Sequence, residues 1–456
     1  MSPRVRRTYR LPLRHAVPRS GYRFEALVLG LVALAALPVV NLTGPQDRTR
    51  YELTRHVVLY GTLTLEPGLF DRAVFDGRTY SDKAPGMSFL AIPTYEAERL
   101  AGIAKAPSGW QDEGDLSLWL LRVLTSGLLF LVSVFVVGRL AERFVQGTGA
   151  VTAAIFGTAT LAAPLAPTFF EHDAAGALAI AAFALALRGS RRGVLALAGL
   201  CAGVAVLFEY ATALIAVALV VLCAVRYGRR VAWFVLGGVP AALALAAYDW
   251  AAFGSPFHLS YRYIVGRLEE RQHGGFFGIG LPTLHGLRDV LFVDRGLLVF
   301  SPVLVAAAAG LVLMWRRGYR GEALVAVVVT VALLVSDAGY FLPYGGGSPG
   351  PRFFAAALPF LVLGLPFALA RFRRTTLVLA AVSVFLTTAD AVTWGVRRET
   401  DRWYPGHGFS DLSKTVWVWL GANRIEGAGI VLLCAYAAFV LGVRGLRTDA
   451  EMHRIP

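Results

Sequence analysis

Two short polar motifs near the start of the chain combine carboxylates with basic side chains. Asp47 opens the run DRTRY, and Lys83 follows Asp82 in the run YSDKAP. A carboxylate can take a proton from an attacking hydroxyl, and a fixed cation can stabilise negative charge on a leaving group. Each motif alone also has a purely structural explanation, since Asp47 suits a helix cap, and Asp82 with Lys83 suits a solvated pair in a turn.

Further charged residues stand at the ends of other apolar stretches. Arg352 ends the run GGGSPGPR, in which glycine permits close backbone approach and the arginine can grip a phosphate with two hydrogen bonds. Glu171, His172 and Asp173 are consecutive, and three ionisable residues in a row are uncommon at a membrane boundary. The structural alternatives are a loop hinge with a snorkelling side chain at Arg352 and a helix cap at Asp173.

Composition indicates that these motifs belong to a membrane protein. Of the 456 residues, 56% are hydrophobic and 16% charged, and the mean hydropathy is +0.59. A soluble core of this size needs far fewer apolar residues. The net charge of +14 does not indicate nucleic-acid binding, because the basic residues form short clusters between apolar runs instead of one stripe. The three cysteines lie inside apolar runs without ligand or disulfide spacing, which argues against redox chemistry.

The apolar runs predict an all-α protein with about twelve transmembrane helices, since roughly 20 apolar residues in a helix span a bilayer. The expected spans are approximately 24–40, 116–137, 149–167, 174–187, 193–209, 211–225, 231–250, 296–314, 322–342, 353–370, 375–394 and 429–443. No internal repeat or soluble domain is evident. Residues 24–446 are therefore expected to form one membrane domain between cytoplasmic tails at 1–23 and 447–456.

Arginine clusters predict the orientation of the spans. Beyond the arginine-rich amino terminus, clusters occupy every second loop, at 188–192, 226–230, 316–320 and 371–374. Because basic loops stay on the cytoplasmic side, both termini are expected inside a bacterial cytoplasmic membrane, with the alternate loops facing the periplasm or cell exterior. The outer loops are expected at 41–115, 168–173, 251–295, 343–352 and 395–428. The first is the longest, and it is expected to carry the active site and two interfacial helices, at 50–60 and 86–101.

The order and spacing of the two early motifs after a first span resemble those of the GT-C glycosyltransferases, in particular the branch of aminoarabinose transferases and protein O-mannosyltransferases. That family opens its first outer loop with an Asp-Glu-x-Arg-Tyr type of motif and continues with Tyr-x-Glu-Lys-Pro-Pro. The counterparts in this chain are residues 47–51 and 80–85. Arg48 stands in place of the second acid and Asp82 in place of the glutamate, so the resemblance supports a single catalytic carboxylate in this motif.

The resemblance implies inverting transfer of a sugar from a polyprenyl-phosphate-linked donor to an acceptor hydroxyl at the outer face of the membrane. It implies a general base, for which Asp47 is the first candidate, and a second catalytic acid, whose place Asp173 occupies. The residues expected to bind the donor phosphate are Lys83, Arg352 and Arg50. Those expected to orient the substrate or acceptor are Tyr51, His172 and Glu171.

A metal is optional in this interpretation. In the aminoarabinose branch the acid before the lysine and a later histidine bind a zinc-like cation, and Asp82 with His258 could imitate that pair. Because no third ligand is evident, no cofactor is required, although a divalent cation is possible.

A polytopic transporter or a flippase for lipid-linked sugars is the alternative function, since twelve spans with both termini inside suit a secondary transporter equally well. The lack of a two-half repeat and the gathering of ionisable residues at the outer boundaries favour the transferase. An oligosaccharide polymerase or ligase would carry its large outer loop late in the chain. The sequence leaves open which sugar is moved and whether the acceptor is a glycan, a lipid or a protein.

Overall fold

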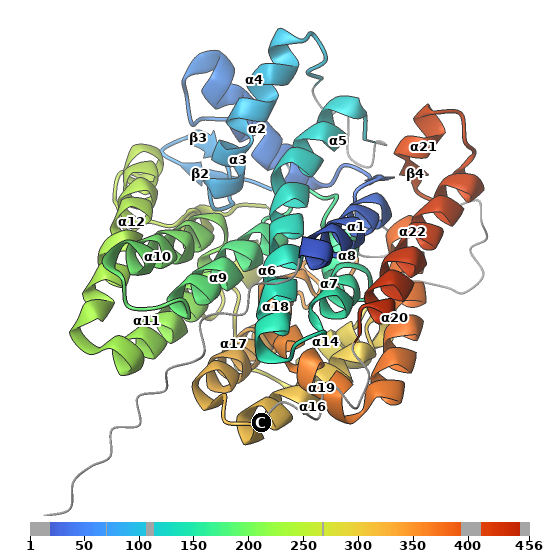
Figure 1. Ribbon diagram of the computed structural model, residues 1–456. Coiled ribbons are helices and arrows are strands. Elements are labelled where there is room, and N and C mark those ends of the chain that lie inside the picture. The colour runs from blue at the N-terminus through green and yellow to red at the C-terminus, as the bar shows by residue number, and fades with distance from the viewer. Residues whose placement is uncertain (1–18, 70, 106–113, 267–268, 394–411, 447–456) are drawn as a thin grey trace, which may run out of the picture.

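The computed structural model describes residues 19–69, 71–105, 114–266, 269–393 and 412–446. Helices make up most of these residues, and the strands among them form two short antiparallel pairs (Figure 1). Residues 1–18 of the expected tail at 1–23, the expected tail at 447–456 and residues 395–411 of the expected outer loop at 395–428 lie outside the described residues.

The helices and strands fall into three consecutive parts of the chain. The first part contains α1 (Arg19–Ala36), β1 (Val39–Val40), α2 (Pro45–Tyr60), β2 (Ala73–Phe75), β3 (Arg78–Tyr80), α3 (Gly86–Leu90), α4 (Ile92–Leu100), α5 (Leu116–Arg122) and α6 (Leu128–Phe144). The middle contains α7 (Gly149–Thr158), α8 (Ala162–Leu165), α9 (His172–Ala186), α10 (Arg192–Phe208), α11 (Ala213–Tyr227), α12 (Val231–Phe253), α13 (Glu269–Gln272) and α14 (Leu284–Phe292). The last part contains α15 (Leu297–Phe300), α16 (Val303–Arg316), α17 (Arg320–Gly339), α18 (Leu358–Leu361), α19 (Leu365–Arg371), α20 (Arg373–Thr393), β4 (Lys414–Thr415), α21 (Val416–Trp419) and α22 (Arg424–Arg444).

Each apolar segment expected to span the membrane is largely helical. Among the described residues, six helices are long and apolar enough to cross a membrane, or seven if one sharply bent pair is a single span. Four shorter apolar helices are Phe24–Ala36, Gly149–Thr158, His172–Ala186 and Arg192–Phe208. The all-α membrane architecture therefore agrees with the sequence, whereas twelve crossings and the cytoplasmic position of both termini stay predictions.

The segment expected as one span at 296–314 is broken. A bend of 92° separates Leu284–Phe300 from Val303–Arg316. Pro302 stands at the break, and a proline both lacks the N–H that would continue the first helix and disfavours helical geometry in the preceding residue. Apolar periodicity does not reveal such a bend, because the residues on both sides of the break are apolar.

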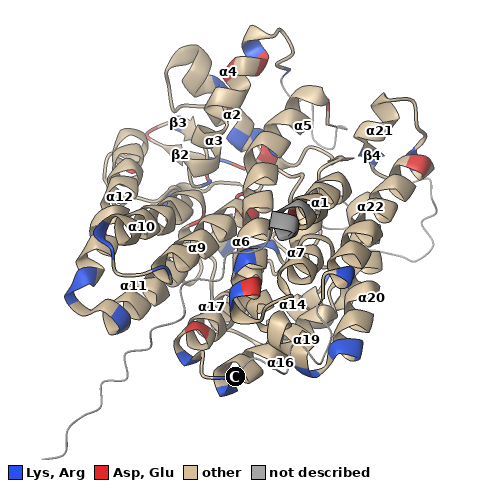
Figure 2. Ribbon diagram, in the orientation of Figure 1, with Lys and Arg blue, Asp and Glu red and all other residues tan. Residues whose placement is uncertain are grey.

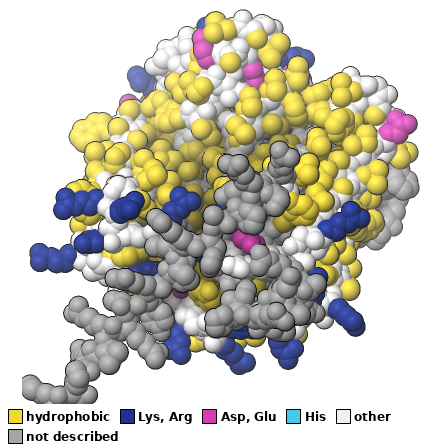
Figure 3. Space-filling model, viewed as in Figure 1, with side chains coloured by type: hydrophobic (Ala, Val, Ile, Leu, Met, Phe, Trp, Pro, Cys, Tyr) yellow, Lys and Arg dark blue, Asp and Glu magenta, His cyan; other side chains and the backbone are white. Residues whose placement is uncertain are grey.

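Apolar and basic side chains occupy different zones of the surface. Figure 3 shows hydrophobic side chains over much of the visible face, with Lys and Arg projecting mainly along its lower part. In Figure 2 many basic segments lie at ribbon ends near α11, α16 and α19. Large apolar side chains such as Leu243 and Leu433 are 63% and 71% exposed on long helices. This distribution suits a lipid-facing belt bordered by basic loops in one headgroup layer.

The described residues of the expected first outer loop at 41–115, termed the outer segment, cover one end of the helical body. Figure 1 places α2, α3, α4 and the β2–β3 hairpin together at the top of the view. The helix expected at 50–60 begins earlier, at Pro45, because proline suits the first helical position and Gly44 precedes it as the N-cap. The segment expected at 86–101 forms the two short helices α3 and α4. Leu53 of α2 packs with Tyr80 and with Phe253 of α12, so the segment is anchored to the helical body.

The contact between α10 and α12 depends on glycine. A Cβ atom on Gly199 would lie 1.8 Å from the carbonyl oxygen of Phe234, and one on Gly237 would lie 1.9 Å from that of Ala196. These separations are far below van der Waals contact, so the two backbones approach as closely as small residues permit in membrane helices.

We expect Gly199→Ala to destabilise the protein by about 1 to 3 kcal/mol, because the added methyl group must push the two helices apart. Gly193→Ala is the matched control, since it lies on the same helix and its Cβ would meet no atom within 4 Å. Unfolding of both variants in mixed detergent micelles measures the difference. Equal stability of the two variants would contradict the close packing.

A buried carboxyl group joins α4 to the start of α5. The Ser117 hydroxyl donates a hydrogen bond to Oε2 of Glu98 at 2.6 Å, and the Glu98 side chain is buried. Burial raises the pKa of Glu98 to about 7, with a smaller contribution from Asp115. The folded protein therefore holds this proton more tightly than the unfolded chain does.

We expect stability to fall as the pH rises from the ordinary glutamate pKa of about 4.3 through about 7, because ionisation of Glu98 is disfavoured only in the folded state. Glu98→Gln should reduce this pH dependence while keeping an acceptor for Ser117. Thermal unfolding of the two proteins between pH 4 and pH 8 tests the expectation. Parallel profiles would show that Glu98 is not the group responsible.

Candidate active site

Asp47 lies in the first turn of α2, where both of its carboxylate oxygens have partners. Its Oδ2 accepts a hydrogen bond from the Gly44 N–H at 2.9 Å, and its Oδ1 accepts one from the Phe169 N–H at 3.0 Å. Oδ2 also lies 3.1 Å from Nη2 of Arg122, and both side chains are fully buried. The N-cap residue of α2 is Gly44, not Asp47. Asp47 stands three residues later and stabilises the start of the helix by accepting from the Gly44 N–H.

Arg50, one helical turn after Asp47, forms a fully buried ion pair with Glu171. Its Nη1 also donates to the backbone oxygen and to the side chain of Gln46, each at 3.2 Å. Burial alone would raise the pKa of the Glu171 carboxyl, but Arg50 and then His172 outweigh it and lower the pKa to about 2. Glu171 is therefore ionised at physiological pH, and the pair links α2 to the residue before α9.

Lys83 stands between two carboxylates. Its Nζ lies 2.6 Å from Oδ2 of Asp82 and 3.2 Å from Oδ2 of Asp71. Burial alone would lower the pKa of the ammonium, but Asp71 and Asp82 outweigh it and the pKa is raised. Arg50 is also among the charges that act on Lys83. The lysine is thus a constant cation within the same cluster as Arg50, and Asp71 is a partner that the sequence analysis did not identify.

Arg352 joins this cluster from a distant part of the chain. Its guanidinium lies over the rings of Phe170 and Phe353, 4.8 and 5.1 Å from their centroids. Among the charged groups that act on the Arg352 guanidinium, Glu171 has the largest effect and Arg50 the next largest. A Cβ atom on Gly345, whose φ is +70°, would lie 2.6 Å from the Arg352 Nε. The glycine-rich loop therefore packs directly on the arginine, which is the close backbone approach expected from its composition.

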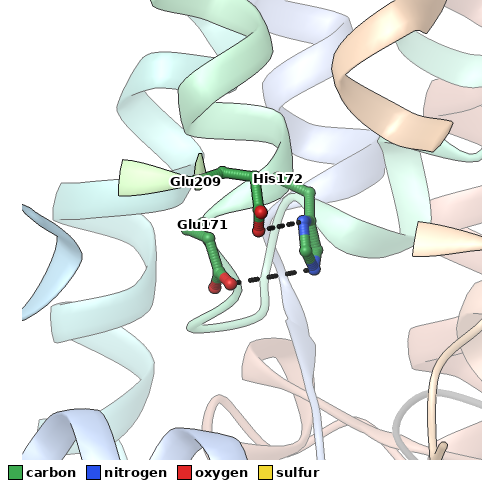
Figure 4. A group of neighbouring side chains, drawn as sticks. All are labelled: Glu171, His172 and Glu209. Atoms are coloured by element: carbon green, nitrogen blue, oxygen red, sulfur yellow. Dashed lines mark ion pairs between the residues drawn. The ribbon is translucent and has the colours of Figure 1, made fainter. Parts of the chain in front are cut away.

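His172 contacts two carboxylates. Its Nδ1 lies 3.2 Å from Oε2 of Glu209, and its Nε2 lies 3.9 Å from Oε1 of Glu171. Figure 4 shows Glu171 and Glu209 directed toward the two nitrogens of the one imidazole ring. All three side chains are buried. Glu209 directly follows α10 as its C-cap, and the sequence gives only a weak indication of a role, so its place beside His172 could not be predicted.

The other expected site residues lie apart from this contact network. Tyr51 packs edge to face against Tyr95, with 5.6 Å between ring centroids. His258 Nδ1 lies 2.7 Å from the hydroxyl of Tyr263, and this is the main polar contact of its ring. Among the described residues, the group that brings three potential metal ligands together is Glu171, His172 and Glu209, and it contains neither Asp82 nor His258.

Several buried aspartates lack hydrogen-bond partners among the described residues. One oxygen of Asp173 and both oxygens of Asp249 and Asp337 are in this state. Asp249 lies near the end of α12, and its charge is one of those that act on the Tyr210 hydroxyl. That hydroxyl lies 3.4 Å from Oγ of Ser260. Asp249 and Asp337 were not singled out from the sequence, although an acidic residue within an apolar segment is the signal that would have identified them.

No protein-family model matches the chain, and no curated protein matches its sequence significantly. Solved structures are similar in fold. ArnT from Cupriavidus metallidurans in the apo state gives a TM-score of 0.51 at 17% identity over 93% of this chain and 77% of ArnT. The undecaprenyl-phosphate-bound form of that ArnT gives 0.50 at 16% identity over 96% and 79%. Arabinosyltransferase EmbB from Mycobacterium smegmatis gives 0.50 at 14% identity, over 95% of this chain but 43% of EmbB. The chain therefore shares the fold of these ArnT and EmbB structures, which agrees with the resemblance of its two early motifs.

The buried pair of Arg122 and Asp47 provides a stability test. Arg122 also donates hydrogen bonds to the carbonyl oxygens of Asn41 at 2.8 Å and Leu42 at 3.1 Å. Arg122→Met should cost about 3 to 5 kcal/mol, because it leaves a buried carboxylate unpaired. Arg99→Met is the control, since the Arg99 side chain is 44% exposed and water screens its pair with Glu96, so its loss should change stability far less. An equal loss of unfolding free energy in both variants would contradict this assignment.

Proposed function

We propose that this protein transfers a sugar from a polyprenyl-phosphate-linked donor to an acceptor hydroxyl at the outer face of a bacterial cytoplasmic membrane. The observation that carries the proposal is the convergence of three buried or largely buried cations, Arg50, Lys83 and Arg352, from three separate segments. The GT-C fold supports the same reaction class. The acceptor is a glycan, a lipid or a protein.

The three cations suit a lipid phosphate as the leaving group. Negative charge grows on the phosphate oxygen as the glycosidic bond breaks, and fixed cations in a water-poor site stabilise that charge. The Nε groups of Arg50 and Arg352 have no hydrogen-bond partner among the described residues, so each guanidinium retains a donor for a phosphate oxygen. Lys83 would add a compact charge, and Asp71 with Asp82 holds it in position until the donor arrives.

We assign proton removal to Asp47 and give Asp173 a supporting role in orienting the acceptor. In this step the acceptor oxygen attacks the anomeric carbon, its proton passes to the carboxylate, and the bond from that carbon to the phosphate oxygen breaks on the opposite face. The anomeric configuration is inverted. Oδ1 of Asp47 accepts one hydrogen bond and so keeps a second lone pair for the acceptor proton, whereas one oxygen of Asp173 has no hydrogen-bond partner among the described residues.

The remaining candidates have less direct roles. Glu171 holds Arg50, and His172 lies beside Glu171, so both would orient the substrate through the cation cluster. Tyr51 would support the first turns of α2 through its packing on Tyr95. This transfer step requires no cofactor.

We expect Asp47→Asn to lower sugar transfer by about 100-fold or more, because general-base catalysis contributes at least that factor. The assay is reconstitution in liposomes with a panel of polyprenyl-phosphate sugars and candidate acceptors, with products identified by mass. Asp115→Asn is the matched control, because Asp115 is also a carboxylate of the first outer segment and caps α5 through the Leu118 N–H at 3.0 Å. The control should retain transfer.

Asp173→Asn distinguishes the role of Asp173 from that of Asp47. We expect this substitution to raise the KM for the acceptor more than it lowers kcat. Full transfer by the Asp47→Asn variant would exclude Asp47 as the base. Loss of transfer in the Asp115→Asn control to the same extent would attribute the effect to the fold of the segment. Absence of any product from the wild-type protein across the panel would overturn the proposed function.

A further inference from the structure

We propose that Glu171, His172 and Glu209 form a binding site for a divalent transition-metal cation. The three side chains come from the junctions at the start of α9 and the end of α10. One ligand atom from each lies within 4.8 Å of the others. The side chains are only 5%, 1% and 6% exposed, so the site is shielded from bulk water.

Each carboxylate presents one anchored oxygen and one available oxygen. In Glu171, Oε2 is paired with Arg50 while Oε1 is turned toward His172. In Glu209, Oε1 accepts from the Ala211 N–H at 3.3 Å while Oε2 faces His172 and has no hydrogen-bond partner. Metal-ligating carboxylates are commonly fixed in this way by hydrogen bonds to the oxygen that does not bind the ion. The anchors orient the two available oxygens toward the same ring.

The histidine itself points to a ligand. Both ring nitrogens of His172 are buried without a hydrogen-bond partner, although Nδ1 lies 3.2 Å from Oε2 of Glu209. The two atoms are thus neighbours without the alignment of a donor and an acceptor. Two ligands of one tetrahedral ion, each about 2.0 Å from it, lie about 3.3 Å apart. The observed separation matches this value, and an ion bound to Nδ1 and Oε2 would satisfy two atoms that are otherwise orphaned.

The donor atoms determine the class of cation. One imidazole nitrogen with two carboxylate oxygens suits Zn²⁺ or Mn²⁺ better than Ca²⁺, which prefers six to eight oxygen ligands. Three protein ligands leave further coordination positions for water or for an oxygen of a bound anion. Neither Asp82 nor His258 is needed for this site.

Charge balance links the cation to a phosphate. The negative charges of Glu171 and Glu209 stand beside two guanidinium groups, since Arg50 pairs with Glu171 and the charge of Arg352 also acts on Glu171. Adding a divalent cation gives the cluster an excess of positive charge, which favours a nearby anion. The cation and a phosphate group should therefore bind cooperatively, each raising the affinity for the other by the same factor. This coupling, unlike the cation site itself, rests on the proposed function.

Binding of Mn²⁺ to the full-length protein in lipid nanodiscs tests the site without any transfer assay. After chelator treatment, the protein is titrated with Mn²⁺ and the free ion is measured by electron paramagnetic resonance, with and without a polyprenyl phosphate in the nanodisc. We expect one Mn²⁺ per chain, competition by Zn²⁺, and tighter binding by about fivefold or more when the polyprenyl phosphate is present.

Two variants and one control make the result specific. His172→Ala and Glu209→Gln should each weaken Mn²⁺ binding by at least about tenfold, the lower limit seen for losing even an indirect metal partner. Glu209→Gln keeps an oxygen for the Ala211 N–H, so it should fold. The control is His56→Ala, because His56 lies 3.8 Å from Glu52 in a second buried contact with a single carboxylate. Its Mn²⁺ binding should match that of the wild type.

Absence of Mn²⁺ and Zn²⁺ binding by the wild type in both lipid conditions would overturn the site, as would unchanged binding in the folded Glu209→Gln variant. Equal affinity with and without polyprenyl phosphate would overturn the coupling. Because metal occupancy is measured directly, a protein that binds the ion but transfers no sugar would leave the cation site standing while the proposed function fails. A protein that transfers sugar but binds neither ion would leave the proposed function standing while the cation site fails.

Discussion

A guanidinium group withdrawn from water is tolerated only where opposite charge and hydrogen-bond acceptors surround it. Arg50 and Arg122 are both fully buried, and each has one carboxylate partner, Glu171 and Asp47 respectively. One member of each pair lies on the first turns of α2, and the other belongs to the helical body. The two pairs therefore fix both the position and the rotation of α2, and with them the start of the outer segment.

The arrangement of the remaining charges follows from that constraint. With α2 fixed, Arg50 lies close enough to Lys83 and Arg352 for their like charges to act on one another. Such a cluster is unfavourable unless acids are interleaved with it, and Asp71, Asp82 and Glu171 supply them. The site is thus nearly neutral as it stands while retaining unused N–H donors, which is the state expected of a binding site prepared for an anion.

The sequence predicted which segments are helical and which residues belong to the charge cluster better than it predicted which side chains pair with one another. Apolar runs located the helical segments, because composition alone determines which segments avoid water, and the DRTRY and YSDKAP motifs identified Arg50 and Lys83. It did not reveal that Arg122 pairs with Asp47 or that Glu209 meets His172, since such partners are brought together only by the packing of distant helices. The bend at Pro302 and the early start of α2 were missed because they depend on local backbone chemistry that hydropathy does not record.

The pairing of β1 with β4 has a consequence for biosynthesis. Val39 and Val40, directly before the outer segment, pair with Thr415 and Lys414 near the other end of the chain. Contacts of such long sequence separation form late, because a large loop must close before they contribute. Most of the polypeptide must therefore be inserted into the bilayer before the amino-terminal edge of the segment that carries α2 is secured. A translation product truncated before residue 414 would contain all the residues proposed to act on the substrate yet lack the strand that completes this edge, which couples maturation of the site to completion of the chain.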